Sequence, residues 1–385
     1  MIMVDTIVLN LEWRKDFEIM EGCYKLFSPD VANFFKPPYV QFGTRKSVKA
    51  DRNPTAKDKR SGNYMPRLTL IKAIRRGSIP IILNVEFSAP KIVFNDNFNE
   101  ISESDLDYLC VQLGRKLYNM GVIVKNRDTL KNAYVSTIHY AKNITLTDYS
   151  TAYEVLSEIE KCNYTTRKQL DRQKYRGGGE AVHFYSSKWG LCVYDKLNEH
   201  KRSKVSERGL LEKDNYCQLS LFDESPLASP FQMIRFEARY IGRPQIGKSL
   251  KEVGITPESL TLRHLFKESI AKKMLKHELD KLRDTYPAIN LSDKKPPQLL
   301  MELSVQNPNV QIGTVFQALA YKTLIEATGN RDIRKMGNFS SQQWYNLNKK
   351  INGLNFARRK LKSFDLIEEQ LGKFTPVRLQ RYLDK

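Results

Sequence analysis

The sequence predicts an α+β fold, with an N-terminal, mainly antiparallel sheet and packed helices, followed by an all-α C-terminal domain. Three observations predict this class. Strand-like stretches recur as far as Ile241, helical patterns separate them, and only helical patterns remain beyond Gly242. Because 385 residues can bury two cores of ordinary size, we expect two domains, at residues 1–246 and 247–385.

The first elements follow from alternation and from chain breakers. The segment Asp5 to Trp13 alternates as a half-buried strand does. Residues 45–63 are polar and basic and contain a proline and a glycine, so we expect a loop there. A β-rich stretch follows at 79–94, interrupted at Pro90.

A helix is expected next, because Ser102 and Asp105 have the spacing of a capping box and Gly121 is a stop signal. Its apolar face comprises Leu106, Leu109, Cys110, Leu113 and Leu117. A strand at 133–146 and a helix at 149–161 follow by the same periodicity argument.

Two strands joined by a short link are expected in the run Val182 to Glu199, and a further strand at Met233 to Ile241. The polar segment 165–180 that precedes them includes three consecutive glycines and is expected to be flexible. The glycines are not a phosphate loop, because no helix opens after them and no G-K-[ST] follows.

In the C-terminal part, the spacing of apolar residues predicts four helices, and three prolines indicate a connector at 290–308. The helices cover Leu260 to Arg283, Gln311 to Thr328, Ser340 to Ile351, and Asn355 to Leu371. The last two are short and basic with a turn near Gly353, a pattern that resembles a helix-turn-helix reader of duplex DNA. A solvated face of a helical bundle explains the same pattern equally well.

Composition favours a nucleic-acid partner. The chain has 63 Lys and Arg against 43 Asp and Glu, a formal charge of +20 and a pI near 9.6. The excess concentrates between Arg45 and Arg76 and again between Arg331 and Lys385. The candidate DNA contacts in these segments are Arg45, Lys46, Lys59, Arg60, Lys349, Lys350, Arg358 and Arg359. A basic surface also serves solubility, so charge alone does not decide the partner.

The cysteines and the N-terminal residues argue against several classes of protein. The five cysteines are odd in number and show no C-x-x-C spacing, which argues against a secreted disulfide framework or a zinc ribbon. Charges occur early in the chain, and no apolar run reaches the roughly 20 residues of a membrane span. We therefore expect a cytoplasmic protein without a membrane partner.

One short run carries the candidate chemistry. VHFYSSKWGLCVYDKLNE places Tyr194 at a strand end, with Lys196 two residues later and Glu199 five residues later. A tyrosine hydroxyl, with an unperturbed pKa of about 10, becomes a useful nucleophile when cations or a metal stabilise the phenolate and the substrate oxyanion. The run supplies a nucleophile, a cation and a carboxylate, although the same spacing also occurs at ordinary amphipathic strand ends.

Four other segments accompany this run in a fixed order: MIMVDTIVLNLEW, NVEFSAPKIVFNDN, YVSTIHYAKNI and, after it, IRFEAR. Over residues 1–245 this order resembles the gene II/X replication initiators of filamentous phages and related plasmids. The Tyr-x-Lys-x-x-Glu run and R-F-E-A-R are the most specific pieces. Where the phage proteins have R-I-D, this chain has T-I-H with His139 in that place, and it has no His-x-His pair.

The resemblance implies a metal-dependent DNA nickase that opens rolling-circle replication in a bacterial host. Tyr194 would cut one strand of origin DNA, form a 5′-phosphotyrosine and leave a 3′-OH for the host polymerase, with a host helicase as a further partner. The covalent link would later allow rejoining without ATP, in keeping with the absence of a G-x-x-x-x-G-K-[ST] loop. Lys196 would stabilise phenolate or phosphate charge.

A divalent ion, Mg²⁺ or Mn²⁺, would polarise the scissile phosphate. The ligand candidates are Glu86, His139 and Glu199, with His183 in reserve. Glu86 and His139 lie in separate predicted strands, and we expect them to converge beside Tyr194.

Other residues of the two signatures have secondary roles. Glu237 and Arg239 are expected to form a structural ion pair rather than a DNA contact. Tyr185 and Tyr240 are the next tyrosines to consider as nucleophiles.

Two further classes of protein fit the same sequence. A non-catalytic origin-binding protein would use only the basic helices, and a relaxase or transposase would use the same tyrosine chemistry for strand transfer. A nicking assay separates the first class from a nickase, whereas the sequence does not separate the second.

Overall fold

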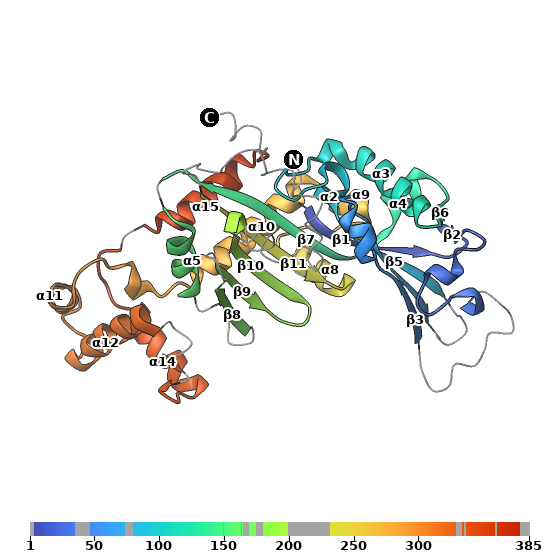
Figure 1. Cartoon of the computed structure of the whole chain (residues 1–385). Helices are drawn as coiled ribbons and strands as arrows, with labels where there is room; N and C mark the ends of the chain where they lie inside the picture. Colours follow the sequence, from blue (N-terminus) through green and yellow to red (C-terminus); the bar gives the residue numbers. More distant parts are fainter. Residues whose placement is uncertain are drawn as a thin grey trace.

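In this computed structural model the described residues are 4–34, 47–73, 80–148, 150–162, 164, 169–174, 180–198, 232–328, 333–334, 336–358 and 360–377. Within them, one antiparallel sheet has the strand order β3-β4-β5-β1-β7-β11-β10-β9-β8 (Figure 1). Its strands are β1 (Val4–Glu12), β3 (Ser47–Arg52), β4 (Arg67–Ala73), β5 (Ile81–Ser88), β7 (Tyr134–Leu146), β8 (Gln169–Lys174), β9 (Glu180–Tyr185), β10 (Trp189–Asp195) and β11 (Gln232–Ile241). A small second sheet pairs β2 (Phe17–Ile19) with β6 (Val122–Val124). The predicted α+β class is confirmed.

Helices connect and follow these strands. The α-helices are α1 (Ala56–Arg60), α2 (Ala89–Phe94), α3 (Leu106–Asn119), α4 (Arg127–Asn132), α5 (Ala152–Glu160), α8 (Arg243–Glu252), α9 (Leu262–Leu265), α10 (Glu268–Asp284), α11 (Pro296–Gln306), α12 (Ile312–Thr328), α14 (Ser341–Asn352) and α15 (Lys362–Lys373). Short 3₁₀ turns are η1 (Tyr24–Leu26), η2 (Ala32–Phe34), η3 (Glu103–Asp105) and η5 (Ala288–Leu291). The mostly helical C-terminal part agrees with the sequence.

Local signals in the sequence set the ends of the helical segment that contains η3 and α3. The backbone N–H and the hydroxyl of Ser102 donate to Asp105 Oδ2 at 2.7 and 2.6 Å, which is the predicted capping box. Gly121, just beyond the C-terminus, has a φ of 72°, and a Cβ there would lie 2.6 Å from Cys23 Sγ. Glycine is therefore required at this stop for both backbone and steric reasons.

The two faces of the sheet differ in character. On β10, Leu191 and Val193 belong to the main hydrophobic core, whereas Cys192 and Tyr194 belong to a small separate cluster. On the core side α5 contacts β9 and β10, and α10 contacts β7 and β11. Because side chains alternate along a strand, the opposite face is free to carry a different, polar set of residues.

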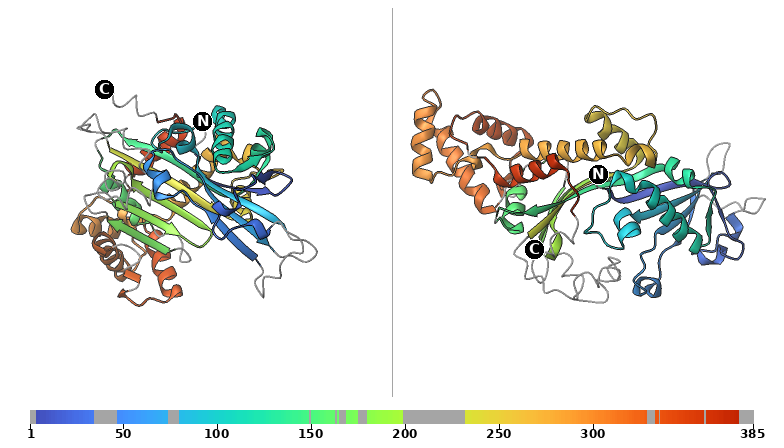
Figure 2. Two further views of the ribbon diagram at one scale, coloured as in Figure 1. Left: turned by 45° about the vertical axis from the view of Figure 1, so that its right-hand side comes forward. Right: turned by 90° about the horizontal axis from the view of Figure 1, so that it is seen from above.

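The C-terminal helices divide between two cores. Helices α8, α9, α10 and α15 join the core of the sheet, whereas η5, α11, α12 and α14 enclose a second core at Ile289, Trp344 and Phe356, among others. Figures 1 and 2 show α11, α12 and α14 at the opposite end of the molecule from β3. The core of the sheet thus extends past residue 246, and the second core is inserted between α10 and α15.

A buried glutamate ties α10 to the sheet. Glu278 is 1% exposed and accepts hydrogen bonds from Trp189 Nε1 at 3.0 Å, from the Tyr240 hydroxyl at 2.9 Å and from the Tyr164 hydroxyl. Burial, reinforced by the Glu278 carboxylate, raises the pKa of both tyrosines, which remain neutral donors. This network lies on the core side of the sheet.

Prolines account for two differences from the sequence expectations. The stretch expected to be β-rich to 94 ends as a strand at Ser88, and Pro90 lies in the first turn of α2. The connector expected at 290–308 contains α11, which begins at Pro296. Proline suits a first helical turn, where no backbone N–H is needed.

Two polar stretches are more ordered than expected. The described part of the loop predicted at 45–63 forms β3 and α1, and Thr55 and Asp58 make a capping box there. The segment expected to be flexible before the hairpin contains β8, which pairs with β9, while residues 177–179 lie outside the described residues. Both β3 and β8 are edge strands, where polar sequences are common because one side meets solvent.

The helix-turn-helix, one of the two interpretations of the basic C-terminal helices, is not formed by α14 and α15, which pack in different cores. Helix α14 packs with α12 in the second core, whereas α15 packs with α10 and β7 in the core of the sheet. Glu368 on α15 pairs with Lys276 at 3.1 Å and Arg283 at 2.6 Å on α10. No helix among the described residues combines the length and the apolar composition needed to cross a membrane.

Candidate functional site

Tyr194 lies on the sheet face opposite the main core. It stands directly across from Arg235 on β11 and from Ala181 on β9, and it is 8% exposed. We call this side of the central strands the polar face. The residues on it include His139, Asn143, His183, Tyr185, Cys192, Tyr194, Arg235, Glu237 and Arg239.

Arg235 is the cation directly opposite Tyr194, and its guanidinium is fixed from several sides. It pairs with Asp5 at 3.2 Å and donates to the Asn97 carbonyl at 2.9 Å and to Asn143 Oδ1 at 3.2 Å. Burial alone would lower the pKa of Arg235, but Asp5, Tyr194 and Glu237 raise it. The result is a permanently charged group, held rigidly beside the tyrosine.

Glu237 is the buried anion of the polar face. Arg239 Nε lies 2.8 Å from its carboxylate, His139 Nδ1 lies 3.2 Å away, and Arg235 Nε lies 3.7 Å away. Burial alone would raise the pKa of Glu237, but Arg239, the hydrogen bond from His139 and Arg235 hold it well below the ordinary value. The ion pair of Glu237 and Arg239 is therefore present, as the sequence suggested.

The depressed pKa of Glu237 makes the stability of this face depend on pH. Its contribution is complete above the ordinary value of 4.5 and is lost as the pH falls through the lower folded-state value. We expect Glu237→Gln to reduce the free energy of unfolding at pH 7 by about 3 kcal/mol or more. That deficit should shrink below pH 4.5, as measured by urea unfolding at several pH values. Glu369→Gln, at the exposed ion pair with Lys373, is the control, and a deficit that stays constant with pH would contradict the assignment.

Lys196 is a second cation next to the tyrosine. Its ammonium lies 5.7 Å from the Tyr194 ring centroid, donates to Asn97 Oδ1 at 2.9 Å, and is 1% exposed. Asp195 turns the chain after β10 by accepting from the backbone N–H and the side-chain amide of Asn198 at 2.9 and 2.7 Å. The Tyr-x-Lys spacing thus places both side chains at one strand end, as the motif predicts.

The described residues give only part of a metal site. His139 and Glu237 could supply a nitrogen and an oxygen ligand, but two arginines already contact the glutamate. His183 Nε2 lies 3.3 Å from Cys192 Sγ, and Glu199 lies outside the described residues. Within the described ranges no group of three or more His, Cys, Asp or Glu side chains is arranged to hold a metal ion.

The expected convergence of Glu86 and His139 beside Tyr194 does not occur. Glu86 lies on β5, and strands β1, β7 and β11 separate it from Tyr194 on β10, roughly 19 Å at about 4.8 Å per strand. It stands opposite Arg67 on β4, with 3.7 Å between the charged groups. Sequence periodicity placed Glu86 in a strand, as observed, but periodicity does not determine the order of the strands.

The structure distinguishes Tyr194 from the other two tyrosines considered. Tyr240 points into the helix-covered core, where its hydroxyl donates to Glu278. Tyr185 is 41% exposed and stands opposite Gly190 on the neighbouring strand. Of the three, Tyr194 alone is directly opposite Arg235 on the polar face.

Three contributors to this site were not anticipated: Asp5, Asn97 and Arg235. Alternation in I-R-F-E-A-R-Y could have indicated Arg235, because its polar residues share one face of a strand. Asp5 and Asn97 reach Arg235 from segments distant in sequence, and no local pattern shows this.

The predicted DNA contacts fall in two distant places. Lys59 and Arg60 lie on α1 at the β3 end of the sheet, and Lys349 and Lys350 lie at the end of α14. Arg358 is exposed and stacks over Phe356 at 5.1 Å. Arg45, Lys46 and Arg359 lie outside the described residues. All eight remain predictions.

The second core carries an apolar surface as well as basic residues. Its large exposed apolar side chains are Met301, Val305, Ile312, Phe316, Leu324, Met336 and Tyr345. An apolar surface of this kind is typical of protein contacts rather than of phosphate contacts.

Removing residues 289–356 tests what this inserted part does. Tyr286 before it and Phe364 after it pack together with ring centroids 6.1 Å apart, so the chain on both sides is held in one core, and a glycine-serine linker would join residues 288 and 357. We expect the deletion protein to keep its sheet. If Lys349 and Lys350 bind phosphates, duplex affinity should fall and the slope of log affinity against log salt should shrink by about 0.9 for each lost contact.

Lys349→Gln with Lys350→Gln in the full chain is the matched variant for this deletion, since it changes charge without removing helices. Unchanged duplex affinity and salt slope in both proteins would show that the inserted helices do not bind DNA. A fragment ending at residue 246 is less informative, because it removes α10 and α15 from the core of the sheet.

Comparison with known proteins gives one finding. Residues 69–251 match the family model that describes the N-terminal part of the replication-associated gene II protein. The match begins in β4, ends in α8 and includes Tyr194, Arg235 and Glu237. It confirms the resemblance to the gene II replication initiators and supports a replication-associated protein. No curated protein and no solved structure matches the chain.

Proposed function

We propose that this protein initiates replication by nicking one strand of origin DNA, with Tyr194 as the nucleophile. The observation that carries the proposal is the position of Tyr194 on the polar face, across from the buried Arg235 and close to Lys196. The match to a replication-associated family supports the biological setting. A protein that only binds its origin has no need of this arrangement of a tyrosine between two fixed cations.

The proposed reaction is a transesterification. The phenolic oxygen of Tyr194 attacks the scissile phosphorus, and the bond from phosphorus to the 3′-oxygen breaks. The phenol loses its proton and the departing 3′-oxygen gains one, leaving a 5′-phosphotyrosine and a 3′-OH. Arg235 and Lys196 stabilise the negative charge that develops, and because they are buried and fixed they need no reorganisation in the transition state. Reversal of the same step rejoins the strand without ATP.

Our proposal includes a divalent ion, Mg²⁺ or Mn²⁺, which would supply Lewis acidity at the phosphate. Among the described ligand candidates, His139 lies two strands from Tyr194, whereas Glu86 lies four strands away. Glu199 stays a candidate outside the described residues.

We expect nicking to require a divalent metal ion, and a substitution of Glu86 serves as the control for substitution of a metal ligand. Nicking by the wild type should stop in EDTA and return with Mg²⁺ or Mn²⁺. His139→Ala should raise the metal concentration needed for half-maximal activity by about tenfold, the lower end of what the loss of a ligand or its support costs. Glu86→Gln should leave that concentration unchanged, because Glu86 lies in a different part of the sheet. Full activity in EDTA would remove the metal from the proposal.

The nicking proposal is tested with supercoiled plasmid that carries the DNA flanking the reading frame. A nickase converts it to open-circular or relaxed DNA, whereas an origin-binding protein retards it and leaves it supercoiled. The second outcome would favour the non-catalytic alternative. A relaxase or transposase shares the chemical step, and only the DNA context separates it from an initiator.

A further inference from the structure

One loop residue, Asn97, contacts both of the cations that flank Tyr194. Its carbonyl oxygen accepts from Arg235 Nη1 at 2.9 Å, and its side-chain Oδ1 accepts from Lys196 Nζ at 2.9 Å. The residue lies in the loop 95–102, which joins α2 to η3, far in sequence from either cation. The separation of the two cations therefore depends on a segment outside the strands that carry the proposed chemistry.

Hydrogen bonds hold the loop on both sides of Asn97. Asp96, which is 2% exposed, accepts from the backbone N–H groups of Phe98 and Asn99, both at 2.8 Å. The carbonyl oxygen of Phe98 accepts from Asn143 Nδ2 at 2.9 Å, which ties the loop to β7. Because buried hydrogen bonds are costly to break, the backbone at Asn97 has a fixed position.

Glu100 anchors the same loop to the sheet and to the C-terminal part of the chain. Its buried carboxylate accepts from Lys142 Nζ at 2.8 Å, from the backbone N–H of Asn143 at 2.6 Å and from that of Val377 at 2.8 Å. Hydrogen bonds to a charged carboxylate are stronger than those between neutral groups. The loop is thus a rigid support for the residues that it contacts.

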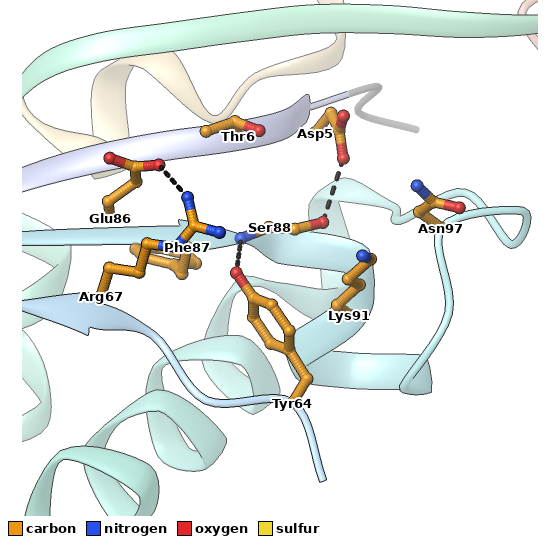
Figure 3. A pocket seen from close by; sticks show the side chains of 9 residues that line it. All are labelled: Asp5, Thr6, Tyr64, Arg67, Glu86, Phe87, Ser88, Lys91 and Asn97. Atoms are coloured by element: carbon orange, nitrogen blue, oxygen red, sulfur yellow. Dashed lines mark hydrogen bonds and ion pairs between the residues drawn. The ribbon is translucent and has the colours of Figure 1, made fainter. Parts of the chain in front are cut away.

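Asp5 is a second anchor of Arg235. It pairs with the guanidinium at 3.2 Å and itself accepts from the Ser88 hydroxyl at 3.0 Å (Figure 3). Asp5, Ser88 and Asn97 line one polar cavity, and Asn97 is half-buried there. A smaller side chain at position 97 therefore meets no steric conflict, and the contact with Lys196 can be removed while both anchors of Arg235 remain.

We propose that Asn97 is a positioning residue of the nicking reaction, which holds the Lys196 ammonium in a fixed place relative to the Arg235 guanidinium. The proposal rests on the proposed function and deepens it. Asn97 acts through Lys196 and not on the reacting atoms. Its effect is large because preorganised charges stabilise a transition state only where they are correctly placed, and a shift of about 1 Å can cost up to about a hundredfold in rate.

The test measures single-turnover nicking by the full-length chain at saturating DNA, with the affinity for DNA measured separately. Asn97→Ala removes the acceptor for Lys196 and keeps the backbone carbonyl that accepts from Arg235. We expect the rate to fall about tenfold while the affinity for DNA stays near that of the wild type. Asn99→Ala is the matched control, because it removes a hydrogen bond to Asp96, of 2.9 Å, within the same loop. It should nick like the wild type.

A double-mutant cycle shows whether Asn97 acts through Lys196. Lys196→Met removes the ammonium, so adding Asn97→Ala to it should lower the rate no further. A purely structural role would instead make the two losses multiply. That result, a wild-type rate in Asn97→Ala, or an equal loss in Asn99→Ala would overturn the positioning role and leave the nickase standing. A wild type that does not nick would overturn both proposals.

Discussion

Tyr194→Phe is expected to lower the rate of nicking by at least about three orders of magnitude, as the loss of an enzymatic nucleophile does. The substitution removes only the phenolic oxygen and keeps the ring that packs against Ala181 on the polar face. Binding of single-stranded DNA and thermal stability should therefore stay near those of the wild type. The measurement is the rate of conversion of supercoiled plasmid to nicked plasmid, with binding measured separately by anisotropy.

Two matched tyrosines serve as controls for this experiment. Tyr185→Phe changes an exposed hydroxyl on the neighbouring strand and should have little effect. Tyr240→Phe removes a hydrogen bond to Glu278 and should lower stability while nicking persists below the melting temperature. Wild-type nicking by Tyr194→Phe would assign the reaction to another tyrosine.

Arg235→Lys is expected to lower nicking by about a hundredfold, the lower range for the loss of one fixed oxyanion donor. Lysine keeps the charge but cannot contact Asp5, Asn97 and Asn143 together, because it lacks the planar fork of the guanidinium. The cation would then no longer be held opposite Tyr194. Single-turnover nicking under saturating DNA measures this loss apart from any loss of affinity.

An arginine-to-lysine substitution at an exposed ion pair is the control for the change of side chain itself. Arg263 pairs with Asp128 at 3.1 Å on the surface, so Arg263→Lys should nick like the wild type. A folded Arg235→Lys protein that nicks at the wild-type rate would reduce Arg235 to a structural role.

The sequence predicted those parts of the fold that depend on local pattern. Alternation located β1 and β7, and the capping box of Ser102 with the stop at Gly121 bounded the segment that contains α3. It also placed Glu86 and His139 on separate strands, as observed. Each of these features is determined by neighbours within a few residues.

The order of strands in a sheet and the packing partners of a helix depend on residues that are distant in sequence. The sequence predictions that were wrong concern these two features. Nothing near Glu86 indicates that β1, β7 and β11 will separate it from Tyr194, so the predicted convergence was wrong. Helix α15 packs on α10, where Glu368 forms ion pairs with Lys276 and Arg283. The periodicity of apolar residues in a helix does not indicate which other helix it will contact. For the same reason the sequence shows that Arg235 is a polar residue of a strand, but it does not show that Asp5 forms an ion pair with it.

The most direct test of Tyr194 as nucleophile is to identify the residue that becomes joined to DNA. The wild-type protein is incubated with plasmid carrying its flanking DNA, denatured and digested with nuclease and trypsin, and the modified peptide is identified by mass spectrometry. Cleavage after Lys188 and Lys196 releases the peptide from Trp189 to Lys196, in which Tyr194 is the sole tyrosine. The account predicts a nucleotide joined through its 5′-phosphate to Tyr194 in this peptide. Nicked plasmid with the nucleotide on another peptide, or with no covalent adduct at all, would contradict it.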